Sequence, residues 1–413
     1  MARGSPWKSP LFFIPLLAAA LTLLLASPGS AQDPRLELML ATARQVRDLL
    51  IEEHVLAPSA QTLTRAAWRG MRRHAPALVE PSAWEGLESA YRAAVAADPE
   101  LGSPMVEAAL RSMVDSLGDP YSAVLTPDQR RWEEQAMKTG SFSGIGVELG
   151  WKQGLRVVSC LDRSPARSSG LRSGDRILAV DGKAVGDMTF YEAGNLLLGP
   201  VGRAVELKLQ RGARQLDVRV PRARIELPGV GYRKLDSSVG YVRIGYFGAD
   251  TAGKVRSSLA ALREQGIDRV VVDLRNNPGG DLEQGLKVAG FFTAGTLVIV
   301  EKRSGRQKLV NRQPAYWTGK ALFLVNRGSA SAAELLAQSV QGKPGRIVMG
   351  EKTFGKARIQ TRYSLPGGGA IHITTARYLS ASGADIDGQG LAPEVLLPDT
   401  GDPLKEAARH LRD

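Results

Sequence analysis

The chain has 413 residues, of which 43% are hydrophobic and 23% charged, as is usual for a soluble globular protein of two or three domains. This composition excludes a fibre, a disulfide-stapled miniprotein and a protein with many membrane spans. The formal charge is +12, but Lys and Arg alternate with Asp and Glu along the whole chain and form no long basic run, so a nucleic-acid partner is not expected.

The first 31 residues are typical of a secretory signal. Arg3 and Lys8 precede an apolar run over 11–26, and small residues follow up to Ala31, where we expect cleavage. The run is short against the ~20 residues that span a bilayer, but retention as an anchor is the alternative. Either way, we expect the protein to be exported to the periplasm or cell envelope, attached to the inner membrane if the segment is retained.

Residues 32–140 are predicted to be largely helical. Positions 36–56 carry apolar residues at helical spacing, and Ala-rich stretches follow at 91–97 and 105–117. The sequence GDPYS at 118–122 predicts a turn that closes these helices.

Residues 141–222 form a second region, in which apolar residues recur with the period of two that is typical of strands. A helix is predicted at 189–198. The predicted strands lie at 144–149, 155–159, 176–180 and 205–209. Together they predict a compact module.

In the last region, 223–413, strands and helices alternate, which predicts an α/β core with a mostly parallel sheet. The strands are expected at 239–244, 269–274, 296–300, 321–325 and 346–349, and the helices at 252–265, 282–292 and 331–340. A hairpin of strands 359–365 and 370–378 follows, joined at 367–369.

The chain is poor in the side chains that usually bind metals or transfer protons. Its one cysteine, Cys160, can form neither an intrachain disulfide nor a Cys-based zinc site, and we expect no metal and no cofactor. His372 lies on a predicted hairpin strand and is expected to be structural. His54, His74 and His410 fall in Arg-rich helical stretches and are expected at the surface.

Ser331 stands between a predicted buried strand and a predicted helix. Ser331 and Glu334 match a capping box, in which each side chain bonds a backbone amide near the other. The alternative is a nucleophile at a helix N-terminus, where free amides and the helix dipole stabilise developing negative charge. Taken alone, the pattern favours the cap.

A nucleophilic serine needs a base, and no histidine stands near an obvious partner. Lys356 could serve if loss of water lowered its pKa. Gly355 lets the backbone approach, Phe354 supplies apolar cover, and Gln360 could orient the amine. The alternative is one more solvated lysine in a basic protein.

The sequence DLRNNPGG at 273–280 runs from a predicted strand into a Gly-rich turn. In open α/β sheets, ligands bind beyond the carboxyl ends of the strands. The amides of Gly279 and Gly280 could therefore help to bind an oxyanion, although a plain turn is the alternative. A phosphate-binding loop is not indicated, because no Gly-Lys-Ser/Thr follows.

In this order, these segments resemble the carboxyl-terminal processing peptidases, which are tail-specific serine peptidases. Residues 141–222 resemble the PDZ module of that family, and the likeness extends over about 105–398. Ala333, Ala357 and Glu394 depart from the usual pattern but remove no catalytic atom. The other matching segments are 118–122, 273–280, 325–334, 350–360 and 375–395.

The resemblance implies a crotonase-like α/β core with an inserted PDZ domain that gates the site, after an N-terminal helical region. Ser331 would be the nucleophile and Lys356 its general base, with Gln360 positioning Lys356. The oxyanion hole would consist of the amides of Ala332 and of Gly279 or Gly280.

The PDZ domain would bind the substrate tail as an added strand and hold its terminal carboxylate with backbone amides. The candidate positions are Gly144, Ile145, Gly146 and Val147. The implied function is a serine endopeptidase of the cell envelope that cleaves proteins with apolar tails near their C-termini. An adaptor protein or a second copy of the chain is a further partner to consider.

Two other functions stay open. A catalytically inactive PDZ adaptor is opposed by the intact Ser331, Lys356 and Gln360. A crotonase-like acyl-CoA enzyme, suggested by the core alone, is opposed by the signal segment and the PDZ module.

Overall fold

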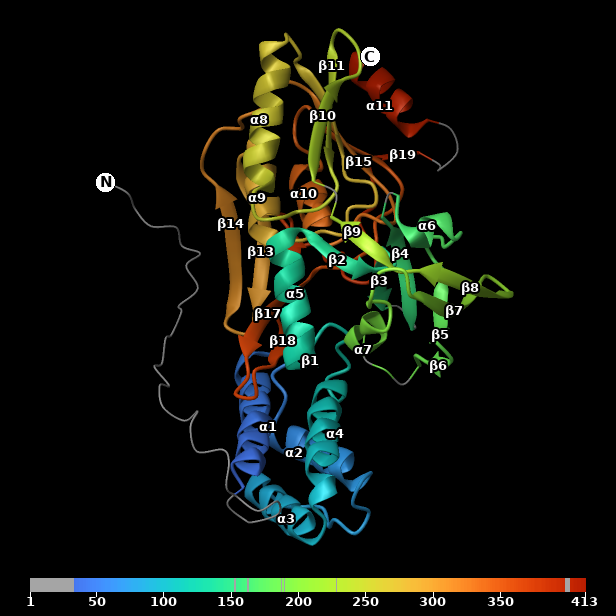
Figure 1. The fold of residues 1–413 in the computed structure, drawn as a ribbon. Helices are drawn as coiled ribbons and strands as arrows, with labels where there is room; N and C mark the ends of the chain where they lie inside the picture. The colour runs from blue at the N-terminus through green and yellow to red at the C-terminus, as the bar shows by residue number, and fades with distance from the viewer. Residues whose placement is uncertain are drawn as a thin grey trace.

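The computed structural model describes residues 33–397, apart from positions 152, 153, 162, 187, 189 and 228, and residues 402–413. The predicted signal segment lies outside these residues. Within the described ranges, no helix has both the length and the apolar character needed to cross a membrane. Figure 1 shows a helical region at one end, an α/β core at the other and a smaller sheet domain at the side.

The helical region consists of α1 (Pro34–Glu53), α2 (Ala60–Arg72), α3 (Trp84–Ala97) and α4 (Gly102–Asp115), with the short 3₁₀ turn η1 (Pro99–Leu101) before α4. Asp33 caps α1 and Ser59 caps α2, each by accepting a hydrogen bond from a backbone amide of the first turn. The helices share one apolar core, which Ile371 and Ile373 of the hairpin extend. The helical region is thereby packed onto the end of the core.

His54, predicted at the surface, is completely buried, and that prediction is wrong. It follows α1 directly, where the chain folds back onto the turn 118–122, and its Nε2 lies 3.3 Å from Asp119 Oδ2. His74 and His410 are exposed, as predicted. His372 lies on a hairpin strand, with Nε2 3.0 Å from a carboxylate oxygen of Glu133.

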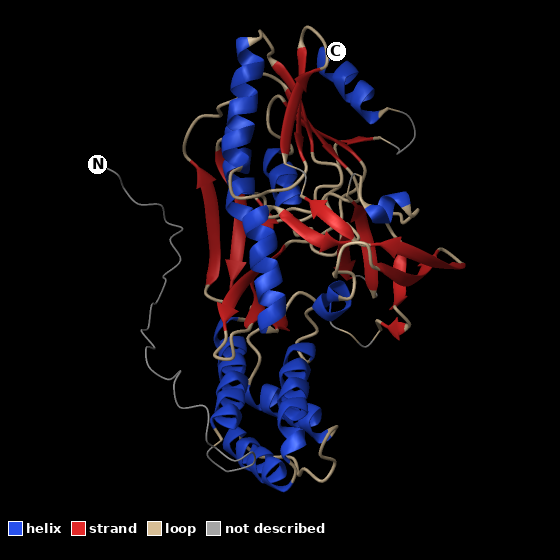
Figure 2. Ribbon diagram, in the orientation of Figure 1, coloured by secondary structure: helices blue, strands red, loops and turns tan. Residues whose placement is uncertain are grey.

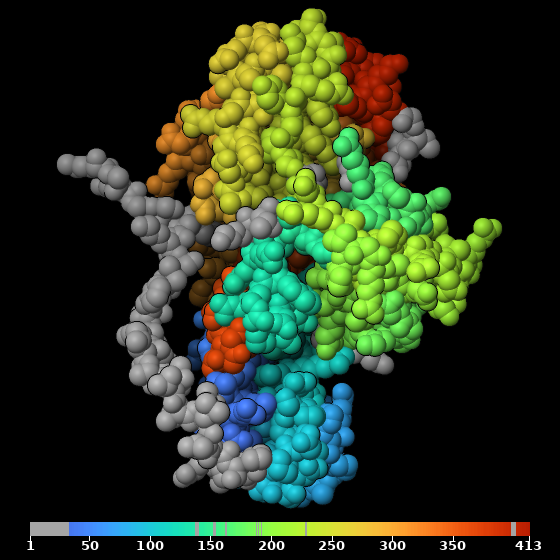
Figure 3. All heavy atoms as spheres, in the orientation of Figure 1, coloured from blue at the N-terminus to red at the C-terminus, as the bar shows by residue number. Residues whose placement is uncertain are grey.

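Strand β1 (Ala123–Leu125) and helix α5 (Pro127–Thr139) lead to the side domain. Thr126 and Gln129 form a capping box at the start of α5, and Gly140 ends it in the left-handed conformation. In the space-filling view, α5 packs between the helical region and the core, next to the side domain (Figure 3).

The side domain is built on a sheet of antiparallel strands in the order β3-β4-β5-β7-β8, with β6 paired to β5. Strands β2 and β9 form a separate pair at its base. The predicted strand 144–149 is divided, because residues 145 and 146 separate β2 from β3, and the helix predicted at 189–198 is shorter. The elements are β2 (Ser141–Gly144), β3 (Val147–Trp151), β4 (Leu155–Cys160), α6 (Pro165–Ser168), β5 (Arg176–Val180), β6 (Lys183–Ala184), α7 (Phe190–Asn195), β7 (Ala204–Arg211), β8 (Arg214–Pro221) and β9 (Ala223–Glu226).

The core has two sheets, and the first is the mostly parallel sheet that the alternation predicts. Its order is β10-β11-β12-β15-β16-β19, with every pair parallel except β10-β11. Apolar side chains on one face pack against the core helices, and those on the other face pack against α11. The strands are β10 (Val230–Lys234), β11 (Val239–Ile244), β12 (Arg269–Asp273), β15 (Ala321–Val325), β16 (Arg346–Gly350) and β19 (Val395–Leu396); the helices are α8 (Thr251–Glu264), α9 (Leu282–Phe292), α10 (Ala332–Val340) and α11 (Pro403–Arg412).

The second sheet is antiparallel, and it contains a strand that the alternation assigned to the first. The strand predicted at 296–300 is β13 (Gly295–Lys302), which turns back into β14 (Gly305–Asn311) and also pairs with β18 (Ala370–Ser380). The predicted hairpin is β17 (Arg358–Ser364) and β18. In Figure 2, the strands of the core lie above the helices of the helical region. The expected fold class, an α/β core with an inserted PDZ-like domain and an N-terminal helical region, is confirmed.

Candidate active site

Three loops meet at one edge of the parallel sheet. They follow β12, β15 and β16, which are neighbours in the sheet and run in the same direction, so their carboxyl ends lie side by side. The first loop contains Gly279 and Gly280, the second ends at Ser331, and the third contains Lys356. The topology thus brings the three sequence motifs to one place.

The first two loops are joined by hydrogen bonds. The amide nitrogen of Asn276 donates to Asn326 Oδ1 at 2.8 Å, and Asn326 Nδ2 donates to Asn276 Oδ1 at 3.0 Å. Ser329 Oγ donates to the Leu274 carbonyl at 2.8 Å. The side chains of Asn276, Asn326 and Ser329 therefore hold the two loops together.

Ser331 has an unusual backbone conformation. It precedes α10 with φ 55° and ψ −118°, which a residue other than glycine rarely adopts. Such strain persists only where the surroundings enforce it, and it is frequent at functional sites. The α/β-hydrolases expose a nucleophilic hydroxyl by the same local geometry, in which a strand, a sharp turn and a helix follow one another with a serine at the turn.

Glu334 connects the serine loop to the lysine loop. The capping box is present, and the Glu334 carboxylate accepts from Ser331 N at 2.9 Å. The same carboxylate accepts from Gly355 N at 2.6 Å, from Lys356 N at 2.8 Å and from the hydroxyl of Thr353. Burial raises the pKa of this fully buried carboxyl, and the hydrogen bonds oppose the rise. The sequence indicated a helix cap, but the residue also fixes the third loop.

Tyr378 also joins the same two loops. Its hydroxyl lies 2.9 Å from the carbonyl oxygen of Ser331 and 2.9 Å from that of Lys356, and the side chain is fully buried. Tyr378 lies within the matching segment 375–395, but sequence reasoning gave it no role. Only the packing of β18 against α10 shows that its hydroxyl reaches both residues.

Lys356 is partly buried, and its amine contacts an aromatic ring. Nζ lies 4.9 Å from the centre of the Tyr121 ring. Within the described residues, Nζ forms no hydrogen bond, with Ser331 or with any other residue. Burial lowers the pKa of Lys356 from its ordinary value. Four carboxylates oppose this shift: Glu148, Glu334, Asp119 and Asp387.

Among the described residues, the side chain of Gln360 bonds to Thr374 and not to the lysine amine. It lies on β17 directly after a shift in the pairing register, and its Nε2 donates to Thr374 Oγ1 at 3.2 Å. The structure therefore brings Ser331 and Lys356 into one site without a hydrogen bond from Gln360 to the base.

The amides expected at the oxyanion hole differ in their availability. Gly279 N donates to Asn277 Oδ1 at 2.8 Å, so this donor is occupied. For the amides of Gly280 and Ala332, the described part of the chain offers no acceptor. A Cβ at Gly279 would lie 2.7 Å from Ser331 Cβ and 2.9 Å from Ala332 N, so only glycine lets this loop approach the serine.

Two strands of the side domain lie against the serine loop and the lysine loop. A Cβ at Gly150 of β3 would lie 2.0 Å from Phe354 Cζ, and one at Gly328 would lie 2.8 Å from the Cβ of Ser159 on β4. Glu148, two residues before Gly150, is partly buried. Burial raises its pKa to about 7, and the charge of Lys356 opposes the rise. No sequence signal linked this carboxylate to the site.

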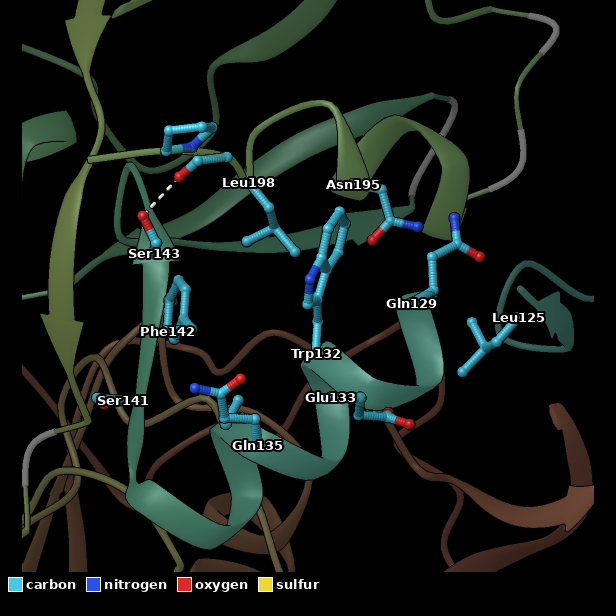
Figure 4. A pocket seen from close by; sticks show the side chains of 13 residues that line it. Leu125, Gln129, Trp132, Glu133, Gln135, Ser141, Phe142, Ser143, Asn195 and Leu198 are labelled. Atoms are coloured by element: carbon cyan, nitrogen blue, oxygen red, sulfur yellow. Dashed lines mark hydrogen bonds between the residues drawn. The ribbon is translucent and has the colours of Figure 1, made fainter. Parts of the chain in front are cut away.

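The candidate tail-binding loop leads from β2 into β3. Gly144 ends β2, Ile145 is buried in the core of the side domain, and Val147 begins β3. Gly146 adopts a positive φ of 74° between them. Beside this loop, an apolar cavity of about 570 Å³ lies between α5 and the side domain, with Trp132 among its walls (Figure 4).

No group of three or more His, Cys, Asp or Glu residues in the described ranges could hold a metal ion.

Two family profiles match the chain. Residues 238–397 match Peptidase family S41, and residues 156–211 match the PDZ domain. Both matches fall on the parts that the structure separates, the α/β core and the side domain.

Curated relatives carry related names. The chain is 33% identical over 295 residues to the "Probable CtpA-like serine protease" of Staphylococcus haemolyticus (strain JCSC1435). The aligned part makes up 70% of this chain and 59% of the relative. The chain is 32% identical over 302 residues to the "Carboxy-terminal processing protease CtpA" of Bacillus subtilis (strain 168), covering 71% and 65%. The chain thus spans about three-fifths of the length of the curated relatives it matches.

Among solved structures, the photosystem II D1 C-terminal processing protease is similar to this chain. The TM-score is 0.71 and the sequence identity 25%, over 90% of this chain and 96% of that protein. The likeness therefore extends over the helical region, the side domain and the core together.

Proposed function

Because residues 238–397 belong to peptidase family S41 and residues 156–211 to the PDZ domains, we propose that this chain is a serine endopeptidase that cleaves proteins near their C-termini. The observation that carries the proposal is the pair of connections between the serine loop and the lysine loop. Glu334 binds the amides of Ser331 and Lys356, and the Tyr378 hydroxyl lies within hydrogen-bonding distance of their carbonyls.

In the proposed reaction, the neutral amine of Lys356 takes the proton of Ser331 Oγ, and the oxygen attacks the scissile carbonyl. The amides of Ala332 and Gly280 receive the oxyanion, each contributing about 3 kcal/mol of transition-state stabilisation. The lysine ammonium then gives its proton to the leaving amine. Water, deprotonated by the Lys356 amine, then attacks the acyl carbon, and the Ser331 oxygen leaves with the proton from the lysine ammonium.

Each proposed role has a physical basis in the surroundings of the residue. Burial lowers the pKa of Lys356, which favours the neutral amine that a base requires. Gly279 contributes its lack of a side chain, because its amide is occupied by Asn277. The side-chain amide of Gln360 donates to Thr374, and the Lys356 amine lies over the Tyr121 ring. Gln360 would therefore position Lys356 only after both side chains have moved.

The substrates follow from the PDZ domain, which indicates protein ligands. We propose that unstructured, apolar C-terminal tails bind beside β3, with the amides of residues 144–147 receiving the terminal carboxylate. The proposed division of the chain is a signal or anchor at 1–31, a helical region at 32–140, a PDZ domain at 141–222 and the peptidase core at 223–413. Export to the cell envelope, and an adaptor or a second copy as partner, belong to the same proposal.

The test is removal of C-terminal residues from a reporter protein with an apolar tail, followed by mass spectrometry. We expect S331A and K356A each to lower the rate at least about 10³-fold, because the two residues act as a unit. The matched control is K352A, which removes an exposed lysine from the same loop. Trimming by K356A at the wild-type rate would exclude the dyad and leave the tail-binding adaptor as the function.

A further inference from the structure

The antiparallel sheet of the core ends in an unpaired strand. In the order β1-β18-β13-β14, no described strand lies beyond β14, and Figure 1 shows β14 on the outer side of the core. Alternate residues of such an edge strand leave their amides and carbonyls unpaired. Of the seven residues of β14, only Leu309 is buried. The strand is therefore a template to which another strand can be added.

Beside this strand lies a cavity of about 980 Å³, between α8, α9 and the chain that follows β14. Its walls include the apolar side chains of Leu286, Phe291 and Leu297. Val310 of β14 also lines the cavity, and 47% of its surface is exposed. An added strand would therefore cover apolar surface as well as unpaired backbone groups.

Hydrogen bonds fix the walls of this cavity. Asn311 Nδ2 donates to the carbonyls of Gly290 at 3.0 Å and Thr293 at 2.9 Å, and so ties the end of β14 to the end of α9. The amide of Trp317 donates to the Phe291 carbonyl at 2.8 Å, which holds the chain after β14 against the same helix. The cavity is thus preformed, as binding sites usually are.

The surroundings of the cavity carry cations without acidic partners. The guanidinium of Arg256 on α8 lies 5.2 Å from the centre of the Tyr316 ring, and that of Arg263 lies 4.8 Å from it. Lys308 on β14 and Arg312 directly after the strand are exposed. In the described part of the chain, none of these four cations forms an ion pair within 4 Å. An arginine held on a ring keeps its N–H donors in place for a carboxylate.

Charge limits what can occupy this surface. Glu283 lines the cavity, but its Oε1 is paired with Lys287 Nζ at 2.8 Å. Pairing with β14 of a second copy would bring Arg306 and Lys308 of both copies together, and like charges on adjacent strands are destabilising. Residues 1–32 contain basic residues but no Asp or Glu. The complementary occupant is an extended acidic segment of another protein.

We propose that β14 and this cavity, together called the β14 groove, bind an extended acidic segment of a partner protein as an added strand. Its carboxylates contact Arg256 and Lys308, and the apolar residues that alternate with them enter the cavity. The β14 groove shares no residue with the proposed active site or with the candidate tail-binding loop. A partner held in the groove therefore leaves both of these free for a substrate.

The test is binding of labelled peptides as long as β14 to the full chain, measured by fluorescence anisotropy. The chain carries S331A so that no peptide is cleaved, and the peptides are amidated so that they present no terminal carboxylate to residues 144–147. We expect a peptide of alternating Glu and Val to bind. A peptide with Glu and Val in two blocks has the same charge but cannot present them on opposite faces of a strand, so it should bind at least about tenfold more weakly.

Charge reversal tests the cations. R256E and K308E should each weaken binding about tenfold, because repulsion replaces a hydrogen bond to a charged group. The matched control is K254E, since Lys254 is exposed on α8 but does not line the cavity. The double variant R256E/K308E should instead bind a peptide of alternating Lys and Val, which the parent chain does not bind. All three positions are exposed, and thermal unfolding checks that each variant is folded.

Methylated peptides test the added strand itself. A strand pairs with one neighbour through the amides of alternate residues only. N-methylation of one alternate set of amides in the Glu-Val peptide should therefore abolish binding, whereas methylation of the other set should leave the affinity within about twofold.

Equal binding of the alternating and blocked peptides would mean attraction by charge alone, and it overturns the added strand. Equal effects of the two methylated sets, unchanged binding by R256E and K308E, or no binding by the parent chain also overturn it. If the chain sediments as a dimer that V310D dissociates, a second copy occupies β14 and the proposal fails in the same way. Because every measurement uses S331A, none of these results depends on whether the chain is a peptidase.

Discussion

Glu148 is a carboxylate that folding places in unfavourable surroundings. It lies partly buried on β3, and in the described part of the chain its charged neighbour is Lys356, which forms no ion pair with it within 4 Å. Burial raises its pKa to about 7 from an ordinary value of 4.5, and Lys356 only partly opposes this shift. Such a group is retained at a cost to stability, which is frequent in functional sites.

The pKa of Glu148 predicts how stability depends on pH. An acid whose pKa is higher in the folded state binds more protons there, so its contribution is lost as pH rises from about 4.5 to about 7. We expect E148Q to unfold at a higher denaturant concentration than the wild type at pH 8, and the difference to vanish at pH 5. The control is E206Q, an exposed carboxylate on β7. A difference that is equal at both pH values would contradict the shift.

At this scale, the sequence could predict the residues with chemical roles but not those that position them. Ser331 and Lys356 are predicted through the family resemblance, which rests on motifs that are local in the chain; the local pattern around Ser331 alone favours a helix cap. Glu334 was recognised only as a cap, and Tyr378 not at all, because their contacts join segments that are distant in the chain. The prediction for His54 was wrong for the same reason: its burial depends on the turn at 118–122, 65 residues further along.

Among the elements, β18 has a special position because it crosses both halves of the site. It pairs with β17, which directly follows the lysine loop, and with β13, and it packs against α10, which follows Ser331. Tyr378 on this strand places one hydroxyl between two carbonyl oxygens, each 2.9 Å away. A hydroxyl has a single proton, so Tyr378 donates to one of these carbonyls or shares the proton between them, and in this way links the two loops.

The variant Y378F tests this connection. It removes the hydroxyl and keeps the buried ring, so two carbonyls lose their shared donor. We expect kcat to fall about tenfold, since about 1.4 kcal/mol of positioning is lost, while KM stays within about twofold. The matched control is Y91F, because the hydroxyl of the fully buried Tyr91 also donates to a backbone carbonyl, that of Gly102 at 3.0 Å, far from the site. Equal kcat values in both variants would show that Tyr378 only supports the fold.

The elements themselves were predictable where their pattern is local. The helix at 282–292 and the strand at 321–325 have the predicted bounds, because a continuous apolar stretch and its flanking turns define them. The sheet to which β13 belongs was not predictable from alternation. Its hairpin partner β14 is an edge strand with mostly exposed, polar residues, which give no period-two apolar pattern.

Across the whole molecule, Asp119 is the point where three parts meet. His54 reaches it from the end of α1, Arg358 from β17 in the core, and the turn that it stabilises carries Tyr121 against the PDZ helix. Burial alone would raise the pKa of this carboxyl, but hydrogen bonds from His54, Ser122 and other groups lower it far below its ordinary value. Asp119 is therefore a carboxylate in the folded protein, and it is this charged form that links the helical region, the core and the turn 118–122.

The substitution D119N should therefore destabilise the whole molecule in a pH-dependent way. A carboxyl with a depressed pKa in the folded state stabilises above its unfolded pKa of about 3.9, and the effect is lost as pH falls towards the folded value. At pH 7 we expect D119N to lower the free energy of unfolding by about 3 to 5 kcal/mol, as when one partner of a buried charged pair is removed. Below pH 4 the difference from the wild type should shrink.

Urea unfolding at several pH values measures this difference, with D268N as the control because Asp268 is exposed. If Asp119 links the parts, D119N should also unfold in two steps, since the helical region and the core each keep an apolar cluster of their own. A single transition with an unchanged midpoint would mean that those clusters hold the parts together. Tyr121 would then depend on its own packing rather than on the carboxylate beneath it.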